Sequence, residues 1–470
     1  MSDTSPQQLA SGPKHGKLFS LSWPIFIDLT MHFFTIIINT AMVSMLSLQA
    51  VAEMNLGGQA FQFAFTLFNF INIGVCVCCA QAIGKGNKKM LRRIVHMSFG
   101  LNIVWGILIT SGCFFGANLI CDIMNIPDDI YVTSKNYLMI LSIMFIAEAV
   151  NLCCSSILRA YGRTRDPMYV NIAANVFVII SNYALLFGHF GFPKMGIYGV
   201  AISAVIARFL SVAFLFYLMR TRTKIRIIPK FFFVVKKDIL KQIFAVGIPG
   251  AGENMTWQLQ FLFMTSVVGT LGSTALATHG IYMQMCTIIM LFSISIALGT
   301  EILISQYAGA MKLKLANKQL LHSVKIGLCI TALLVINIPI WMGDAVLSIF
   351  TSDSTVFEIA RPIFYVSLIM EMGRILNIII INSLRAVNDA KFPMFMAIFS
   401  MWGVSVPVGT FLSLYMGMGL LGVWIGFCCD ECTRGLIMLL RWKSKAWVSK
   451  ARDNYRKHYK TKTKKKGYAL

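Results

Sequence analysis

"LRAYGRTRDPM" (158–168) returns as "LRAVNDAKFPM" (384–394), 226 residues later, and each copy closes a long apolar block. A shift of 225 residues also aligns Pro24 with Pro249 near the starts of the two halves. The same shift aligns further identical pairs in the same order: Gln59 with Gln284, Gly74 with Gly299, Gln81 with Gln306 and Gly84 with Gly309. This fixed order of matches predicts a duplicated fold.

The blocks between these motifs are apolar enough to place the chain in a membrane. Apolar residues make up 57% of the 470 residues and charged residues 13%, and the mean hydropathy is +0.70, as in integral membrane proteins. About twelve blocks reach the roughly 20 residues that a helix needs to cross a bilayer. They start near Leu18, Val51, Ile94, Tyr131, Tyr169, Gly196, Ile239, Thr274, Ile326, Pro362, Met394 and Leu420.

We therefore expect an all-α membrane protein with twelve transmembrane helices in two pseudo-symmetric six-helix lobes. Six spans per repeat is an even number, so both repeats enter the membrane from the same side and form a parallel repeat. Two such lobes around a central cleft are typical of transporters. The expected segments are a cytoplasmic N-terminal segment (1–16), an N-lobe (17–220), a basic cytoplasmic linker (221–238), a C-lobe (239–442) and a basic cytoplasmic tail (443–470).

Lysine and arginine concentrate in alternate connections between the predicted spans. The intervening connections carry few basic residues or none. By the positive-inside rule, this pattern places the basic loops and both termini in the cytoplasm. The net charge of +23 is therefore explained by topology and by contact with anionic lipids, and we expect no nucleic-acid partner. The basic segments are 85–93, 158–165, 220–230, 312–318 and 456–466.

Two carboxyl groups occupy equivalent places in the two halves. Pro24 and Pro249 lie inside the first predicted helix of each lobe, and Asp28 and Glu253 follow them by one helical turn. A proline kinks a helix and frees the carbonyl four residues before it, and an acid one turn later lies on nearly the same face. Each acid could brace the kink in protonated form by bonding the freed carbonyl. The favoured hypothesis is that it exchanges a proton for a cation during transport.

Further duplicated motifs resemble one family of transporters. AQAIGKG (80–86) and SQYAGAM (305–311) close the second predicted helix of each lobe, and CDECTRGLIMLLRWKSKAW (429–447) carries a DE..RG.....RW pattern. Together with the repeat, they make residues 17–445 similar to the multidrug and toxic compound extrusion (MATE) transporters, and to a bacterial branch of that family.

The resemblance implies a secondary antiporter of the bacterial cytoplasmic membrane. Members export organic, usually cationic, compounds in exchange for H⁺ or Na⁺ by rocking two lobes. The expected partners are small organic cations and membrane lipids, and the expected state is a monomer with no cofactor beyond the coupling ion. Asp28 and Glu253 are then the candidate sites of proton or cation coupling.

Three positions depart from the family pattern. Many members carry an aspartate where this chain has Asn39, and many archaeal and some bacterial members carry one where it has Asn182. Because an amide cannot release a proton, the resemblance leaves Asp28 to replace them. In the tenth helix, sodium-coupled relatives place an acid where this chain has Arg374. Glu371, three residues earlier, is expected to form a structural ion pair with it.

Other polar residues of the predicted helices are candidates for substrate binding or for packing. Facing the cleft, they would hydrogen-bond or stack on a planar substrate; facing each other, they would stabilise the bundle. The substrate-binding candidates are Asn39, Gln59, Asn182, Asn254, Trp257, Gln260 and Gln284. A second, charged set is expected near the ends of spans as interfacial ion pairs: Glu148, Arg208, Asp430, Glu431 and Arg434.

Two other functions compete with antiport. A lipid-linked oligosaccharide flippase of the same superfamily would need basic residues along the cleft for a pyrophosphate, whereas the charges expected inside the membrane are acidic. An integral-membrane enzyme is disfavoured because the chain has no nucleotide loop, metal-spaced histidine pair or nucleophile elbow. The twelve cysteines are expected to be small packing residues, so no metal site and no catalytic residue is predicted.

Overall fold

The chain was analysed as a computed structural model, which describes residues 15–223, 225, 228–234, 236–348 and 351–459. Residues 1–14 of the expected N-terminal segment and 460–470 of the expected tail lie outside the described residues. Within the described part the chain is helical, without strands.

The first half contains eight α-helices and a short 3₁₀ turn in the described residues. The two helices α5 and α6 together cover one predicted span. The elements are α1 (His15–Ser44), α2 (Leu48–Lys85), α3 (Lys88–Phe115), α4 (Ala117–Ile123), α5 (Asp128–Ser142), α6 (Met144–Ala160), α7 (Arg165–Phe187), α8 (Ile197–Thr223) and η2 (Pro229–Phe231).

The second half repeats this order and adds a helix after the last span. Helical segments from α14 to η5 follow one another without a break and cover one predicted span. The elements are α9 (Lys237–Thr270), α10 (Ser273–Gly309), α11 (Leu313–Val335), η3 (Ile336–Trp341), α12 (Gly343–Leu347), α13 (Ser354–Ala386), α14 (Lys391–Ser400), η4 (Met401–Ser405), α15 (Val406–Thr410), η5 (Phe411–Tyr415), α16 (Leu420–Lys443), α17 (Ala446–Asn454) and η6 (Tyr455–Tyr459).

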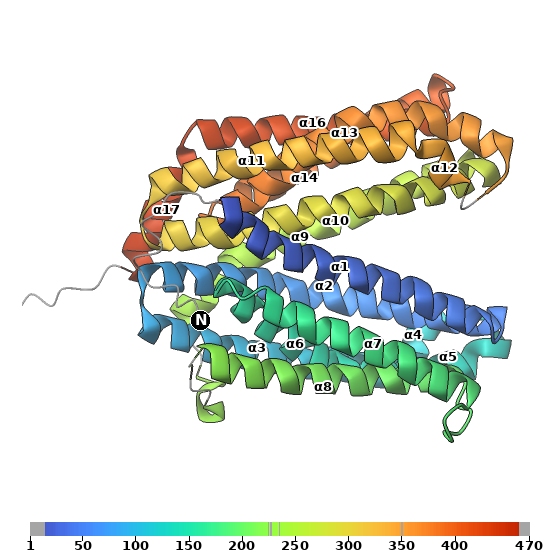
Figure 1. The fold of residues 1–470 in the computed structure, drawn as a ribbon, viewed down its shortest axis with the longest axis horizontal. Coiled ribbons are helices and arrows are strands. Elements are labelled where there is room, and N and C mark those ends of the chain that lie inside the picture. The colour runs from blue at the N-terminus through green and yellow to red at the C-terminus, as the bar shows by residue number, and fades with distance from the viewer. Residues whose placement is uncertain (1–14, 224, 226–227, 235, 349–350, 460–470) are drawn as a thin grey trace, which may run out of the picture.

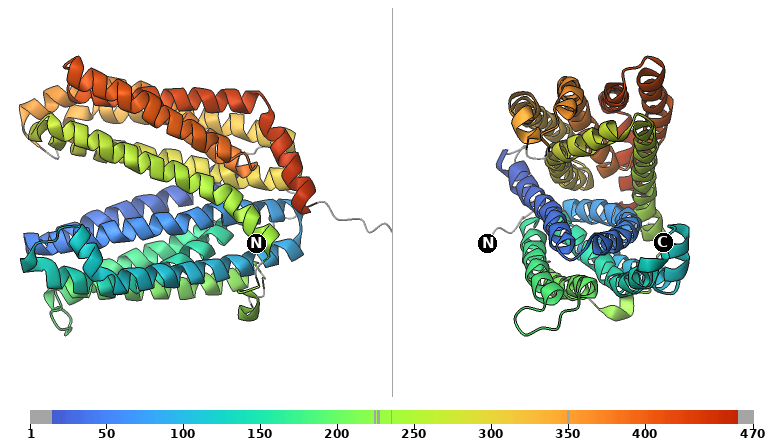
Figure 2. Two further views of the ribbon diagram at one scale, coloured as in Figure 1. Left: turned by 180° about the vertical axis from the view of Figure 1, so that it is seen from behind. Right: turned by 90° about the vertical axis from the view of Figure 1, so that its right-hand side faces the viewer.

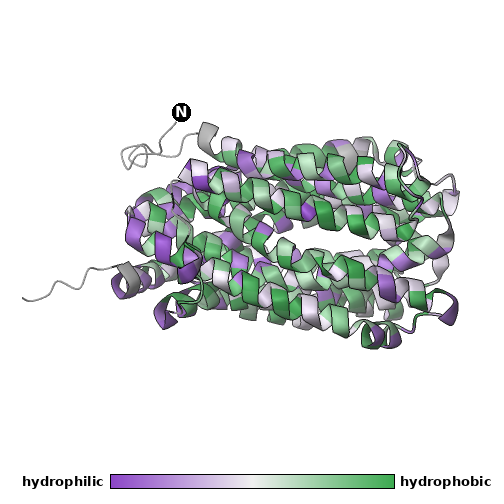
Figure 3. Cartoon of the chain, turned by 90° about the horizontal axis from the view of Figure 1, so that it is seen from below, coloured by the Kyte–Doolittle hydropathy of each residue, from purple (hydrophilic) through white to green (hydrophobic). Residues whose placement is uncertain are grey.

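The helices form two lobes, the N-lobe (α1–α8) and the C-lobe (α9–α16), as the repeat predicts (Figure 1). The ribbons of the lobes converge at the end where α17 lies and diverge toward the opposite end (Figure 2). Most of the length of the helices is hydrophobic, and hydrophilic residues gather at the ends of the bundle (Figure 3). We call the end that carries α17 and the connections α2–α3, α6–α7 and α10–α11 the basic end.

Ten helices among the described residues are long and apolar enough to cross a membrane. The two expected spans outside this set are α9 and α16. Both carry polar residues along their length, Glu253 and Gln260 in α9 and Asp430 and Arg434 in α16. These side chains line the cavity described below, so the same residues lower the hydropathy and build the site.

Local sequence fixes the turn between α2 and α3 at the basic end. Gly86 ends α2 in the left-handed conformation, with φ of 73°, which a glycine adopts without steric cost. Asn87 then caps α3, because its side chain accepts a hydrogen bond from the Met90 N–H. The turn takes two residues, so the helices run antiparallel side by side.

The lobes meet through exchanged contacts between their first and second helices. α1 packs against α10 of the other lobe, and α9 packs against α2. A Cβ atom on Gly74 of α2 would lie 2.2 Å from the carbonyl oxygen of Ile243 in α9, and one on Gly247 of α9 would lie 2.0 Å from that of Phe70. Larger residues at these glycines would force the helices apart.

The basic end is closed by a symmetric pair of hydrogen bonds between the lobes. Gln81 of α2 donates through Nε2 to the Ala386 carbonyl at 2.8 Å, and Gln306 of α10 donates to the Ala160 carbonyl at 2.9 Å. Both donors and both acceptors are equivalent positions of the repeat. We call these two bonds the glutamine latch.

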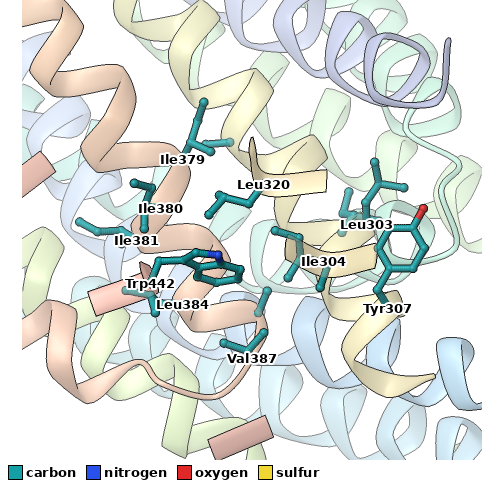
Figure 4. Packing of buried hydrophobic residues seen from close by; sticks show 14 of the residues in the cluster. Leu303, Ile304, Tyr307, Leu320, Ile379, Ile380, Ile381, Leu384, Val387 and Trp442 are labelled. Carbon is teal, nitrogen blue, oxygen red and sulfur yellow. The ribbon is translucent and has the colours of Figure 1, made fainter. Parts of the chain in front are cut away.

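Each lobe has its own buried apolar core. In the C-lobe, Leu303 and Ile304 of α10 pack with Ile380 and Leu384 of α13 and with Trp442 of α16 (Figure 4). Inside a bilayer such packing stabilises through van der Waals contact between helices. The same cluster includes Leu18, Leu21 and Ile25 of α1, so apolar packing also joins the C-lobe to the first helix of the N-lobe.

Candidate functional site: a charged cavity between the lobes

A cavity of about 520 Å³ lies between the two lobes. This volume is within the roughly 300–1,000 Å³ of small-molecule sites. Helices α1, α2, α6, α7 and α8 line it from the N-lobe, and α9, α10, α13 and α16 line it from the C-lobe. Because both lobes contribute, any relative movement of the lobes changes its shape.

The two predicted acids line this cavity, and each is held by an arginine. Arg159 Nη2 lies 2.9 Å from Asp28 Oδ2, and Asn171 donates to Asp28 Oδ1 at 2.9 Å. Arg385 Nη2 lies 2.6 Å from Glu253 Oε2. The kink-bracing hypothesis is therefore wrong for both acids, since their hydrogen bonds go to other helices, although Pro24 and Pro249 do lie inside α1 and α9.

Arg159 and Arg385 are functional candidates that the sequence analysis missed. Both stand in the duplicated "LRA" of the opening motif and close equivalent helices. The motif indicates the repeat, but the motif alone does not show that its arginines contact the acids. Two pairs of equivalent residues, an acid on the first helix and an arginine on the fourth, could have been matched from the sequence alone.

A second pair of equivalent positions carries an ion pair with reversed polarity. In the N-lobe, Arg208 Nε lies 2.6 Å from Glu148 Oε2. The repeat places Arg374 at the position of Glu148 and Glu431 at the position of Arg208, and these two lie 3.3 Å apart. The same bridge between helices is thus built in both lobes with its charges exchanged.

The expected interfacial location of this charged set is wrong. Glu148 lies well inside the span formed by α5 and α6, Arg208 lies in the middle of α8, and all five members of the set line the cavity. In α16, Arg434 Nη2 lies 2.6 Å from Asp430 Oδ2 and 3.3 Å from Glu431 Oε2. The ion pairs agree with the prediction, but their position in the middle of the spans does not. Hydropathy does not show how deep in the membrane a charged residue lies when it faces another helix.

The predicted pair of Glu371 and Arg374 is present. Arg374 Nη1 lies 2.5 Å from Glu371 Oε1, and Glu371 is fully buried. Arg374 also bonds Glu431 through Nε, so it bridges α13 and α16 instead of serving one carboxylate. Asn377 completes this bridge with a 2.8 Å bond to Glu431.

The cavity wall carries charges of both signs. This overturns the expectation that the charges inside the membrane are acidic, which had counted against a flippase. Ion pairs account for every carboxylate on the wall except Glu301. Six carboxylates and five arginines line the wall: Asp28, Glu148, Glu253, Glu301, Asp430 and Glu431, with Arg159, Arg208, Arg374, Arg385 and Arg434.

An aromatic wall faces these charges from the C-lobe. Trp257 of α9 stacks on Phe261 with ring centroids 5.7 Å apart, and Trp424 of α16 packs edge-on against Phe427 at 5.5 Å. All four rings line the cavity. Aromatic faces attract organic cations and stack on planar groups.

The seven predicted substrate-binding residues divide into two groups. Asn254, Trp257 and Gln260 line the cavity, and Gln260 Nε2 is buried without a hydrogen-bond partner. Gln59 and Gln284 are exposed on α2 and α10 and are not part of the wall. The pseudo-symmetry that pairs them does not show which face of a helix points inward.

Asn39 and Asn182 also lie outside the cavity wall. The structure brings them together: Asn182 Nδ2 donates to Asn39 Oδ1 at 3.0 Å, and Ser203 donates to Asn182 Oδ1. Two amides and a hydroxyl thus satisfy one another among α1, α7 and α8. This network occupies the two positions where the family resemblance led us to expect acids.

Metal ligands and disulfides are not found among the described residues. No group of three or more His, Cys, Asp and Glu side chains is placed to hold a metal ion in that part of the chain. All twelve cysteines are free thiols, and six of them are buried.

Comparison with known proteins identifies the family. The sequence pattern of the MatE family matches residues 24–184 and again 249–411. The chain belongs to the MatE family. The two matches cover the two halves of the repeat, so each lobe carries one copy of the MATE unit.

Curated relatives cover nearly the whole MATE chain. An uncharacterized transporter, YisQ of Bacillus subtilis, is 34% identical over 92% of this chain and 95% of its own length. The probable multidrug resistance protein NorM of Thermotoga maritima is 29% identical over 88% of this chain and 89% of its own. The homologues are transporters, and the chain is a multi-pass membrane protein of the MATE multidrug efflux family.

Solved MATE structures have the same fold. A MATE in the bent conformation gives a TM-score of 0.87 at 18% identity, over 96% of this chain and 100% of the other. An outward-facing multidrug resistance MATE transporter of the MOP superfamily gives 0.86 at 18% identity, over 96% and 99%. This agreement supports the twelve-helix, two-lobe arrangement.

Proposed function

We propose that this chain is a secondary antiporter that exports organic compounds in exchange for H⁺ or Na⁺ by rocking its two lobes. The observation that carries the proposal is the cavity itself, because each lobe contributes one carboxylate–arginine pair, Asp28–Arg159 and Glu253–Arg385. Rocking moves the two pairs relative to each other and changes which side of the membrane each pair faces. A cation that binds the carboxylate competes with the arginine, so cation binding and lobe position are coupled.

The proposed substrates are small organic cations. Asp28 and Glu253 supply carboxylates that can pair with a cation in place of their arginines. The aromatic rings of Trp257 and Phe427 supply faces for a planar substrate. Relatives named as multidrug resistance proteins agree with a substrate of this chemistry. The cavity residues transport without catalysis, and no cofactor beyond the coupling ion takes part.

The proposed orientation has the basic end and both termini in the cytoplasm of a bacterial cell. Lysine and arginine gather in the connections of that end, as the positive-inside rule requires. The glutamine latch closes this end, and the lobes diverge at the other (Figure 2). In this orientation the cavity faces the outside of the cell. The proposed transporter works as a monomer.

The test uses the full chain reconstituted in liposomes loaded with ethidium, a planar organic cation. An inwardly directed H⁺ or Na⁺ gradient is imposed, and ethidium efflux is followed by fluorescence. The proposal expects efflux that depends on one of the two gradients and is abolished when both are dissipated. Gradient-independent efflux, or no efflux of ethidium and of other organic cations under either gradient, would contradict it.

The five arginines of the wall favour one alternative, a flippase for a lipid-linked pyrophosphate. Arginine binds such groups through bidentate hydrogen bonds. Against this function, all five arginines are already paired with carboxylates. Transfer of a fluorescent polyprenyl pyrophosphate between leaflets of the same liposomes, without ethidium efflux, would support the flippase.

A further inference from the structure

One carboxylate of the cavity wall stands apart from all the others. Glu301 of α10 is 3% exposed, and its Oε1 atom is buried without a hydrogen-bond partner. The other carboxylates of the wall each have an arginine nitrogen within ion-pair distance. An unpaired ionised carboxylate in an apolar site is far more costly than a neutral acid.

The fold itself does not require an acid at this position. The repeat places Cys76 of α2 where Glu301 stands in α10, and Cys76 packs against a buried apolar cluster and is not part of the cavity wall. The N-lobe therefore builds the same helix with a small apolar residue. Glu301 is a polar group added to one side of a symmetric framework.

Arg385 is placed to respond to the charge of Glu301. It acts on Glu301 electrostatically while its Nη2 bonds Glu253. Its Nε atom is buried and has no acceptor. Two buried polar atoms near the cavity thus lack a hydrogen-bond partner: the acceptor Oε1 of Glu301 on α10 and the donor Nε of Arg385 on α13.

The other charged groups on helices packed against α10 are already engaged. Asp28 of α1 bonds Arg159, and Arg374 of α13 bonds two carboxylates. On α2 the facing titratable group is the Cys76 thiol. Helix α11 contributes no residue to the wall. Arg385 is therefore the cation that a charged Glu301 would attract.

We propose that Glu301 is a proton-binding site of the transport cycle, neutral in the conformation seen here, and that its deprotonation draws Arg385 away from Glu253. The proton of the carboxyl O–H passes to water, and the resulting carboxylate gains the guanidinium of Arg385. Glu253 then loses its partner and becomes free to bind the cationic substrate. This inference rests on the proposed antiport and names one group that binds a proton during its cycle.

The experiment detects the proton directly. Infrared difference spectra between acidic and alkaline buffer are recorded for the full chain in liposomes. The wild type should show the carbonyl stretch of a protonated carboxyl that disappears as the pH is raised. Glu301→Gln should lose that band, Glu301→Asp should shift it, and Glu358→Gln, an exposed carboxylate of α13, should leave it unchanged.

A band that persists unaltered in Glu301→Gln would overturn the inference. If the glutamine variant does not fold, Glu301→Asp decides alone, since a band that does not shift would have the same meaning. The spectra need no transport, so the two proposals fail separately. Gradient-driven efflux without a Glu301 band would contradict the proton site at Glu301. A Glu301 band without efflux would contradict the proposed antiport.

Discussion

The glutamine latch makes a quantitative prediction about the equilibrium between closed and open basic ends. Gln306→Ala removes one hydrogen bond between the lobes, from Nε2 to the Ala160 carbonyl at 2.9 Å. Gln81→Ala removes the equivalent bond to the Ala386 carbonyl and also the bond that Gln81 accepts from Asn454. The net contribution of one such bond is about 0.5–1.5 kcal/mol, so the loss of either bond of the latch should by itself lower the ratio of closed to open molecules by about 2- to 13-fold.

The double variant should lower that ratio further, by about 5- to 150-fold if the bonds contribute independently. Single-molecule fluorescence energy transfer measures the ratio between dyes on non-natural amino acids at Lys89 and Lys314. Both residues are exposed at the basic end, and they are equivalent in the repeat. The variants should move molecules from the high-transfer to the low-transfer population.

Matched controls come from the same two helices. Gln59→Ala and Gln284→Ala remove exposed glutamines that are also equivalent in the repeat, and they should leave the transfer distribution as in the wild type. An unchanged distribution in the Gln81→Ala, Gln306→Ala double variant would refute the latch. A change of the same size in the controls would show that the assay reports something other than the basic end.

Three further predictions follow from other contacts between helices. Glu148→Ala should reduce the yield of monodisperse protein on size-exclusion chromatography, because it leaves the partly buried Arg208 without its partner, at a cost of at most about 3–5 kcal/mol. The reversed pair Glu148→Arg with Arg208→Glu should recover the yield, and failure to recover would argue against the polarity exchange seen at Arg374 and Glu431. Gly309→Ala should favour the open basic end in the energy-transfer assay, since its Cβ would lie 2.0 Å from the Gln81 carbonyl oxygen. Gly280→Ala has open space around its Cβ and should leave the distribution unchanged. The same energy-transfer distribution in both variants would show that the contact of Gly309 with Gln81 does not hold the basic end closed. Asn454→Ala should weaken the attachment of α17 to α2 by removing the 3.0 Å hydrogen bond to Gln81 Oε1, and residues 446–459 should then exchange their amide hydrogens faster. Unchanged exchange would mean that the contact of Lys85 with the Tyr455 ring is enough to hold α17 on α2.

The sequence predicted the spans and the repeat because both depend on local pattern. Apolar blocks of membrane length and identical residues at a fixed shift need no knowledge of helix orientation. The same shift brought Asp28 and Glu253 together as equivalent acids, and both do line the cavity. What it could not supply was the direction of each side chain, so Gln59 and Gln284 were placed in the cavity and lie outside it.

Arg159, Arg385 and Glu301 were missed for a different reason. Matching identical residues across the repeat finds groups that both lobes share, such as the arginines of the LRA motif, but does not say what they contact. The comparison of identical residues also does not find equivalent pairs whose charges are exchanged between the lobes. It does not find Glu301 either, because the equivalent residue in the N-lobe is Cys76. Asymmetric positions become visible once the helices are packed and each buried polar atom can be checked for a partner.

The central claim is that the carboxylates of the cavity couple cation movement to substrate export. Comparing net efflux with exchange tests it most directly, in liposomes containing wild type, Asp28→Asn or Glu253→Gln. Exchange between identical ethidium pools needs no coupling ion. We predict that Asp28→Asn abolishes gradient-driven efflux and keeps exchange, and that Glu253→Gln weakens both. Gradient-driven efflux at the wild-type rate in Asp28→Asn would contradict the account and leave the Asp28–Arg159 pair a structural role.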